Sequence, residues 1–98
     1  MIIVTGSATA RPGNLDELLA VSLEHVRRSR LEPGCISQAV YHDVENPRRV
    51  VFFEQWADRD ALQAHFEVSE SLTFVEALSR LTEVPPTMEI HTVADRQA

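Results

Sequence analysis

The segment from Val50 to Phe53 is apolar at every position, within an extended run that continues to Trp56. A strand with one face in water alternates apolar and polar side chains, whereas an unbroken apolar run indicates a strand covered on both faces. Helices can cover one face of this strand, and something else must cover the other. We expect a second copy of the sheet to cover the other face, in a two-fold symmetric homodimer with sheets packed face to face.

The rest of the chain predicts strands and helices that alternate around this segment. The expected strands are 2–10, 35–43, 49–56 and 87–93. The expected helices follow capping side chains at Asn14, Asp58 and Ser69, and Pro85-Pro86 ends the last of them. This order suits an α+β fold of the ferredoxin-like type, with an antiparallel sheet and helices on one of its faces.

Apolar side chains recur at helical spacing in the first and third predicted helices. In the first helix they form a stripe of Leu15, Leu18, Leu19, Leu23 and Val26. In the third helix the residues expected to point inward are Leu72, Val75 and Leu78, together with Phe74 and Leu81. These stripes predict which face of each helix meets the sheet.

The chain of 98 residues carries 9 Lys and Arg against 15 Asp and Glu, a net charge of −6. Its length predicts a single domain over 1–98, with a core from about 2 to 93 and a frayed tail at 95–98. A negative surface repels phosphate backbones, so we do not expect a nucleic acid partner. The only basic cluster, Arg27, Arg28 and Arg30, ends the first helix, where cations complement the helix macrodipole.

Several familiar sequence signals are missing. The N-terminal segment has neither a basic region nor a long apolar run, so we expect a cytoplasmic protein without a membrane partner. Cys35 is the only cysteine, which excludes an internal disulfide. The four histidines lack metal-ligand spacing, and the three glycines form no phosphate-binding pattern. A metal site from one local motif is therefore not expected.

The third predicted strand carries the first group of candidate site residues. Because side chains alternate along a strand, Phe52, Glu54 and Trp56 share one face. A carboxylate between two aromatic rings is costly unless it is paired. Glu54 is therefore either a structural partner for an arginine or an orienting group in a pocket. Trp56 is either a core anchor or an apolar pocket wall.

His65 follows Ala61 by four residues, on the buried stripe of the second predicted helix. It is either a hydrogen-bonded core residue or a general base, because the unperturbed imidazole pKa lies nearest neutrality. His25, near the edge of the first helix's stripe, either borders the same cavity or is a partly exposed surface residue. Tyr41 is a further candidate, whose alternative role is simple packing.

Short motifs occur in a recognisable order along the chain. They are Glu32-Pro33-Gly34-Cys35-Ile36, Asn46-Pro47, Val51 through Asp58, Ala61-Leu62-Gln63-Ala64-His65 and Phe74. Together they resemble the signature of the antibiotic biosynthesis monooxygenase family, over about Ile2 to Val93. The resemblance implies a dimeric α/β barrel, with a cavity between the sheet and the helices of each subunit.

Enzymes of this family oxidise electron-rich phenols, quinols or anthrones with molecular oxygen and carry no metal or flavin. The resemblance therefore implies a small aromatic substrate, oxygen as co-substrate and no cofactor. It implies His65 as base or proton shuttle, Trp56 as pocket wall and Glu54 as supporting carboxylate. His25, Phe52 and Tyr41 complete the expected substrate-binding set.

The chain departs from its relatives at several positions. Many of them carry Tyr at the position of Gln38 and a His-Phe pair at Glu70-Ser71. Haem-degrading relatives carry Trp at the position of His65 and His at that of Val75, which disfavours haem breakdown here. Two other functions stay open. One is a small-molecule isomerase that moves protons without oxygen, and the other is a non-catalytic dimeric ligand-binding module.

Overall fold

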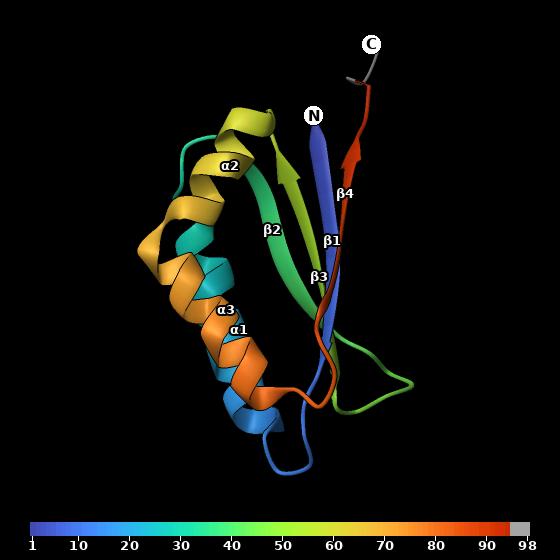
Figure 1. The fold of residues 1–98 in the computed structure, drawn as a ribbon. Helices are drawn as coiled ribbons and strands as arrows, with labels where there is room; N and C mark the ends of the chain where they lie inside the picture. The colour runs from blue at the N-terminus through green and yellow to red at the C-terminus, as the bar shows by residue number, and fades with distance from the viewer. Residues whose placement is uncertain (95–98) are drawn as a thin grey trace.

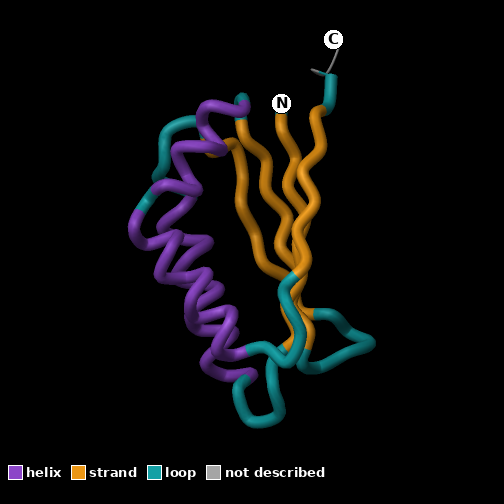
Figure 2. Tube along the Cα trace, in the orientation of Figure 1, coloured by secondary structure: helices purple, strands orange, loops and turns teal. Residues whose placement is uncertain are grey.

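The computed structural model, described here for residues 1–94, forms one antiparallel sheet with all three helices on one face (Figures 1 and 2). The strands pair in the order β2-β3-β1-β4, which confirms the ferredoxin-like α+β prediction. In chain order the elements are β1 (Ile2–Thr9), α1 (Leu15–Ser29), β2 (Cys35–His42), β3 (Arg49–Trp56), α2 (Arg59–Glu67), α3 (Ser69–Leu81) and β4 (Thr87–Thr92). The tail expected at 95–98 lies outside the described residues.

The predicted alternation along β3 is confirmed. Phe52, Glu54 and Trp56 all point toward the helices and are buried. Two apolar clusters form on this inner face of the sheet. One contains Ala8, Ala10, Leu18, Val26, Val50, Phe52, Leu78 and Leu81, and the other contains Ile2, Val4, Trp56 and Leu62.

The buried face of α1 differs from the predicted stripe. Leu23 is exposed, whereas Ser22, His25 and Ser29 are buried together with Leu18 and Val26. A hydroxyl on a helix can bond to the carbonyl four residues earlier, and the Ser29 hydroxyl does so to the His25 carbonyl at 2.7 Å. A pattern that scores only apolar residues misses such serines. Asn14 is the N-cap residue of α1, as predicted, but its side chain makes no capping hydrogen bond.

The second and third helices confirm one predicted cap and contradict another. A side-chain oxygen of Asp58 accepts a hydrogen bond from the backbone N–H of Ala61 at 2.8 Å. Ser69 instead lies inside α3, whose N-cap is the extended residue Val68. In α3, Leu72 is exposed rather than inward, Val75 is exposed but lines the cavity described below, and the buried positions are Ser71, Leu78 and Leu81.

No layer formed by residues 1–94 covers the face of the sheet opposite the helices. Phe53 on β3 is 37% exposed there, and Tyr41 on β2, which pairs with Val51, is 60% exposed. The homodimer stays a prediction that this open face motivates. Within residues 1–94, no helix combines the length and the apolar character that crossing a bilayer requires.

Candidate active site

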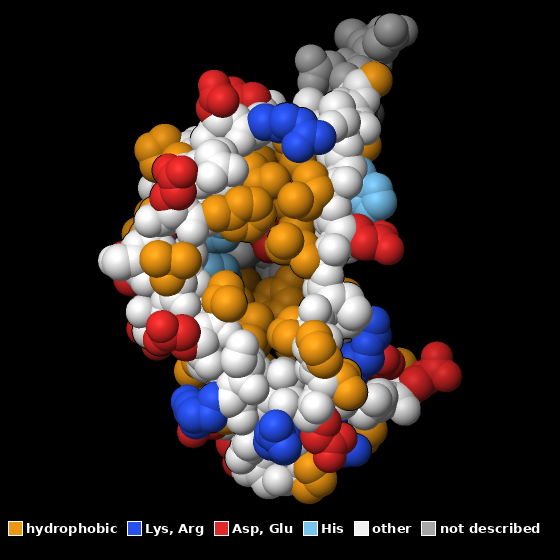
Figure 3. Space-filling view, in the orientation of Figure 1, with side chains coloured by type: hydrophobic (Ala, Val, Ile, Leu, Met, Phe, Trp, Pro, Cys, Tyr) orange, Lys and Arg blue, Asp and Glu red, His pale blue; other side chains and the backbone are white. Residues whose placement is uncertain are grey.

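A cavity of about 300 Å³ lies between the inner face of the sheet and the helices α2 and α3. In Figure 3 it is the hollow between the helices and β4, with apolar side chains around it and histidine at its edge. It borders both apolar clusters, and its lining includes the hydroxyls of Ser79 and Thr87 and four further titratable or hydroxyl side chains near the helices. These are His25, Glu54, His65 and Ser71.

His65 reaches this cavity from α2, where it is 3% exposed. Its Nδ1 lies 2.8 Å from Oε1 of Glu32, in the turn between α1 and β2. A carboxylate only accepts hydrogen bonds, so Nδ1 carries a proton. In the neutral ring Nε2 then holds a free lone pair, which is the arrangement a general base needs.

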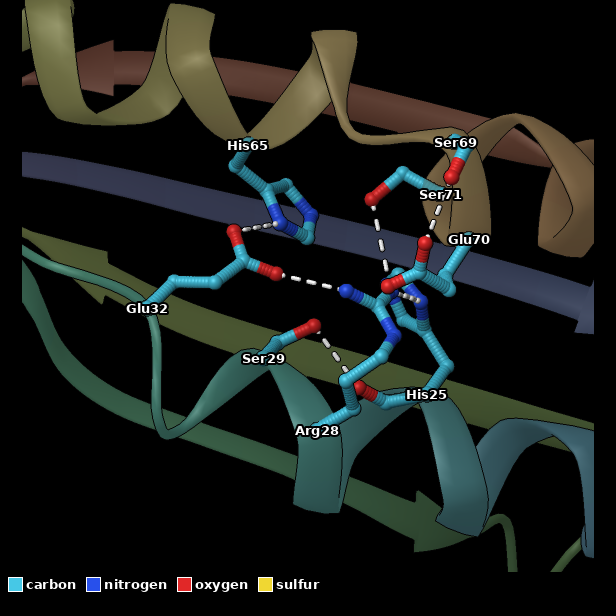
Figure 4. A network of polar contacts seen from close by, with 8 residues as sticks. All are labelled: His25, Arg28, Ser29, Glu32, His65, Ser69, Glu70 and Ser71. Atoms are coloured by element: carbon cyan, nitrogen blue, oxygen red, sulfur yellow. Dashed lines mark hydrogen bonds and ion pairs between the residues drawn. The ribbon is translucent and has the colours of Figure 1, made fainter.

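Arg28 joins this pair to a second histidine (Figure 4). Its NH1 donates to Oε2 of Glu32 at 2.7 Å, and its NH2 lies 2.9 Å from Nδ1 of His25. The same NH2 donates a longer bond, 3.4 Å, to the hydroxyl of Ser71. One guanidinium therefore connects α1, the following turn and α3.

His25 is 7% exposed and lines the cavity. Burial, with further contributions from His65 and Arg28, lowers the pKa of His25 to about 3. Its ring stacks on Phe74 with centroids 4.0 Å apart and lies 5.2 Å from the ring of His65. His25 is thus a neutral imidazole inside the site, and the alternative of a partly exposed surface residue is wrong.

Glu54 lines the cavity from β3 and is also buried. Its Oε1 accepts a hydrogen bond from Nε1 of Trp56 at 2.9 Å. Burial raises the pKa of Glu54, while the Trp56 bond and the nearby His65 oppose that shift. The carboxyl is paired with an indole rather than with the arginine that one interpretation of the sequence required.

The other predicted site residues lie farther from the cavity. Trp56 stands behind His65, with ring centroids 4.7 Å apart, and Phe52 contacts Phe74 edge-on at 5.9 Å. Neither residue lines the cavity, so each supports a side chain that does. Tyr41 lies on the opposite face of the sheet and is not part of this cavity.

Sequence patterns missed the polar residues that hold the histidines. Glu32 was visible only as part of a turn motif, and the position of Arg28 in the last turn of its helix indicated only a macrodipole role. Their side chains are 14% and 23% exposed, and their hydrogen bonds show that they belong to the site. The 33-residue separation of Glu32 and His65 leaves no local signal for their pairing.

Two of the positions where the family resemblance is broken, Gln38 and Ser71, are buried near this network, whereas Glu70 and Val75 are exposed. Ser71 lines the cavity, and Gln38 is paired in register with Glu54. Among residues 1–94 the side-chain amide of Gln38 has no hydrogen-bond partner. Across the same residues, no three His, Cys, Asp or Glu side chains gather in a way that could hold a metal ion.

Comparisons with known proteins agree with this architecture. The chain is 35% identical over 96 residues to an uncharacterized protein of Synechocystis sp., an alignment that covers 98% of this chain and 65% of the relative. A crystal structure from Deinococcus radiodurans matches with a TM-score of 0.93 and 19% identity, over 100% of this chain and 97% of that one. The protein Rv0793 from Mycobacterium tuberculosis matches with a TM-score of 0.90 and 23% identity, over 99% and 98% of the two chains. The family model described as antibiotic biosynthesis monooxygenase matches residues 1–77, and the chain belongs to this family.

Proposed function

We propose that this protein is a cofactor-independent monooxygenase that oxidises a small electron-rich aromatic, such as a quinol, phenol or anthrone, with molecular oxygen. The observation that carries the proposal is the Glu32–His65 pair at a cavity whose remaining walls are largely apolar. Membership of the antibiotic biosynthesis monooxygenase family supports the same reaction class.

In this mechanism the unprotonated Nε2 of His65 accepts the proton of a phenolic hydroxyl. Glu32 then stabilises the imidazolium that forms, because its carboxylate already accepts the Nδ1 proton. The resulting phenolate is a much better electron donor than the phenol, and transfer of one electron to oxygen gives a phenoxyl radical and superoxide. These combine at a ring carbon that carries hydrogen, and the peroxide takes up the proton held by His65. Loss of water then breaks the O–O bond, so that one oxygen atom stays in the product as a carbonyl and the other leaves as water. Apolar residues such as Phe66, Phe74 and Leu78 exclude water from the reacting ring.

Oxygen uptake tests the proposal directly. Purified protein is given a panel of quinols and anthrones, with a reaction lacking enzyme as the control for autoxidation. We expect His65→Gln to lower kcat by about 10²- to 10⁴-fold, the usual contribution of a general base. His91→Gln is the matched control, because His91 is an exposed histidine on β4. Equal uptake by both variants, or none above autoxidation with the wild type across the panel, would contradict the proposal.

A proton-transferring isomerase is the second candidate. It is favoured by one observation, the presence of a buried carboxyl with a raised pKa, Glu54, and a histidine base, His65, at the same cavity. Such a reaction needs an acid and a base but no electron acceptor. Turnover that persists at full rate under strict anaerobiosis would support the isomerase, and an absolute need for oxygen would exclude it.

A further inference from the structure

The two histidines at the cavity have partners of opposite hydrogen-bonding character. His65 meets a carboxylate, which only accepts, while His25 meets a guanidinium, which only donates. In each ring the partner is bound at Nδ1. Among residues 1–94, neither Nε2 atom has a hydrogen-bond partner, so each remains for a ligand in the cavity that both residues line.

These partners determine which nitrogen of each neutral ring carries the proton. Glu32 requires a proton on Nδ1 of His65, which leaves its Nε2 as an acceptor. Arg28 requires a lone pair on Nδ1 of His25, which places the proton on its Nε2. One guanidinium holds both Glu32 and His25, through different nitrogens, so a single hydrogen-bonded chain links the two rings (Figure 4).

We infer that Arg28 and Glu32 are positioning residues that hold the two histidines in opposite tautomers. The cavity then presents one acceptor, Nε2 of His65, beside one donor, Nε2–H of His25. A fitting ligand is an aromatic molecule with a hydroxyl that donates and a second oxygen that accepts. The ligand class rests on the proposed function, but the tautomers themselves are measurable without turnover.

Nuclear magnetic resonance of the protein labelled with ¹⁵N-histidine tests the tautomers. Spectra that correlate ring nitrogens with ring protons are recorded at pH 8, above the ordinary histidine pKa of about 6.5. His65→Gln and His25→Gln assign the signals. We expect the proton on Nδ1 in His65 and on Nε2 in His25. The reverse state in either ring would overturn the inference.

Glu32→Gln provides a sharper test, because the substitution is nearly isosteric. The guanidinium of Arg28 forms its stronger bond to an oxygen, so the glutamine carbonyl stays with Arg28. The glutamine NH₂ group then faces Nδ1 of His65 and can only donate to it. We expect the tautomer of His65 to invert, with the proton now on Nε2, while His25 stays unchanged.

Glu76→Gln is the matched control, because it removes the same charge from an exposed position of α3. We expect its histidine signals to match the wild type. A melting curve for Glu32→Gln shows whether the fold persists, and Arg28→Met gives a second test in a different residue. In Arg28→Met we expect His25 to lose its fixed tautomer. An unchanged His65 in folded Glu32→Gln, or an unchanged His25 in folded Arg28→Met, would overturn the inference.

Ligand selectivity follows from the same argument. We expect wild type to bind 4-hydroxyacetophenone about 2- to 10-fold more tightly than 4-methoxyacetophenone, the effect of one hydrogen bond. Glu32→Gln should lose this preference, because its cavity would offer two donors. Equal binding of both ketones by the wild type, or no binding of either, would contradict the ligand class. Correct tautomers without oxygen uptake would contradict only the proposed function.

Discussion

His25 is a buried base whose protonation depends on whether the chain is folded. In the folded protein burial, with contributions from His65 and Arg28, lowers its pKa to about 3, against an ordinary value of about 6.5. Between these values the unfolded chain binds a proton that the folded chain does not. Stability therefore falls as the pH falls through this window, by about 1.4 kcal/mol per pH unit for one group.

This difference predicts a pH dependence that a single substitution removes. Between pH 7 and pH 5 we expect His25 to lower the free energy of unfolding by about 2 kcal/mol. Urea titrations at both pH values give the change in the free energy of unfolding for the wild type and for His25→Gln. The contribution of His25 is the difference between these two changes. The comparison of the two proteins is needed because the raised pKa of Glu54 stabilises the folded protein as the pH falls, which opposes the effect of His25. The control is His91→Gln, an exposed substitution that should keep the wild-type slope.

At the scale of elements, the turn from α1 to β2 determines where Glu32 lies. Gly34 in this turn has a φ of +82°, a conformation that costs other residues about 1–2 kcal/mol. A Cβ on Gly34 would also lie 2.4 Å from Cβ of Ala61 in α2. The turn and the helix that carries His65 therefore meet where no side chain fits between them.

We expect Gly34→Ala to destabilise the protein by more than the cost of the backbone conformation alone. Gly13→Ala is the matched control, because Gly13 has a φ of +87° but nothing within 4 Å of an added Cβ. Gly13→Ala should lower the free energy of unfolding by about 1–2 kcal/mol, and Gly34→Ala should lower it by more. Thermal or urea unfolding of the two variants measures the difference. Equal losses of unfolding free energy in the two variants would show that the close approach to Ala61 adds no cost, which would contradict this prediction.

The strands and helices also show how much of the fold and of the site could be predicted from the sequence. The order of elements along the chain and the alternation of side chains along β3 follow from turn residues and a period of two, and both are confirmed. Which face of β3 points toward the helices could not be predicted. The faces of α1 and α3 were partly wrong, because buried serines such as Ser22 and Ser71 carry no apolar signal. The Glu32–His65 contact joins residues distant in sequence, which periodicity cannot reveal.

At the scale of the whole molecule, the helices cover one face of the sheet, and no element of residues 1–94 covers the other (Figure 1). The open face carries Phe53 and Tyr41, both exposed. Exposed aromatic rings on a flat sheet are favourable sites for burial against a partner. The homodimer predicted from the apolar segment of β3 would bury this face against its own copy.

We expect the wild type to sediment at twice the chain mass of 11.0 kDa at micromolar concentration. Phe53→Arg should sediment as a single chain, because it would place a charge in the buried interface. Leu72→Arg is the control, because it adds the same charge at an exposed apolar position of α3. A wild type of single-chain mass, or a Phe53→Arg variant that stays paired, would count against this interface.

The cavity draws its proton-handling groups and part of its rim from different stretches of the chain. His25, Arg28, Glu32 and His65 all precede α3, whereas residues 86–88 line the cavity from the side of β4. Substitutions in that late segment can reshape the entrance without touching the hydrogen bonds that hold the histidines. Under the proposed function, substitutions at residues 86–88 would therefore change which ligand fits, while the two histidines and their partners keep their arrangement.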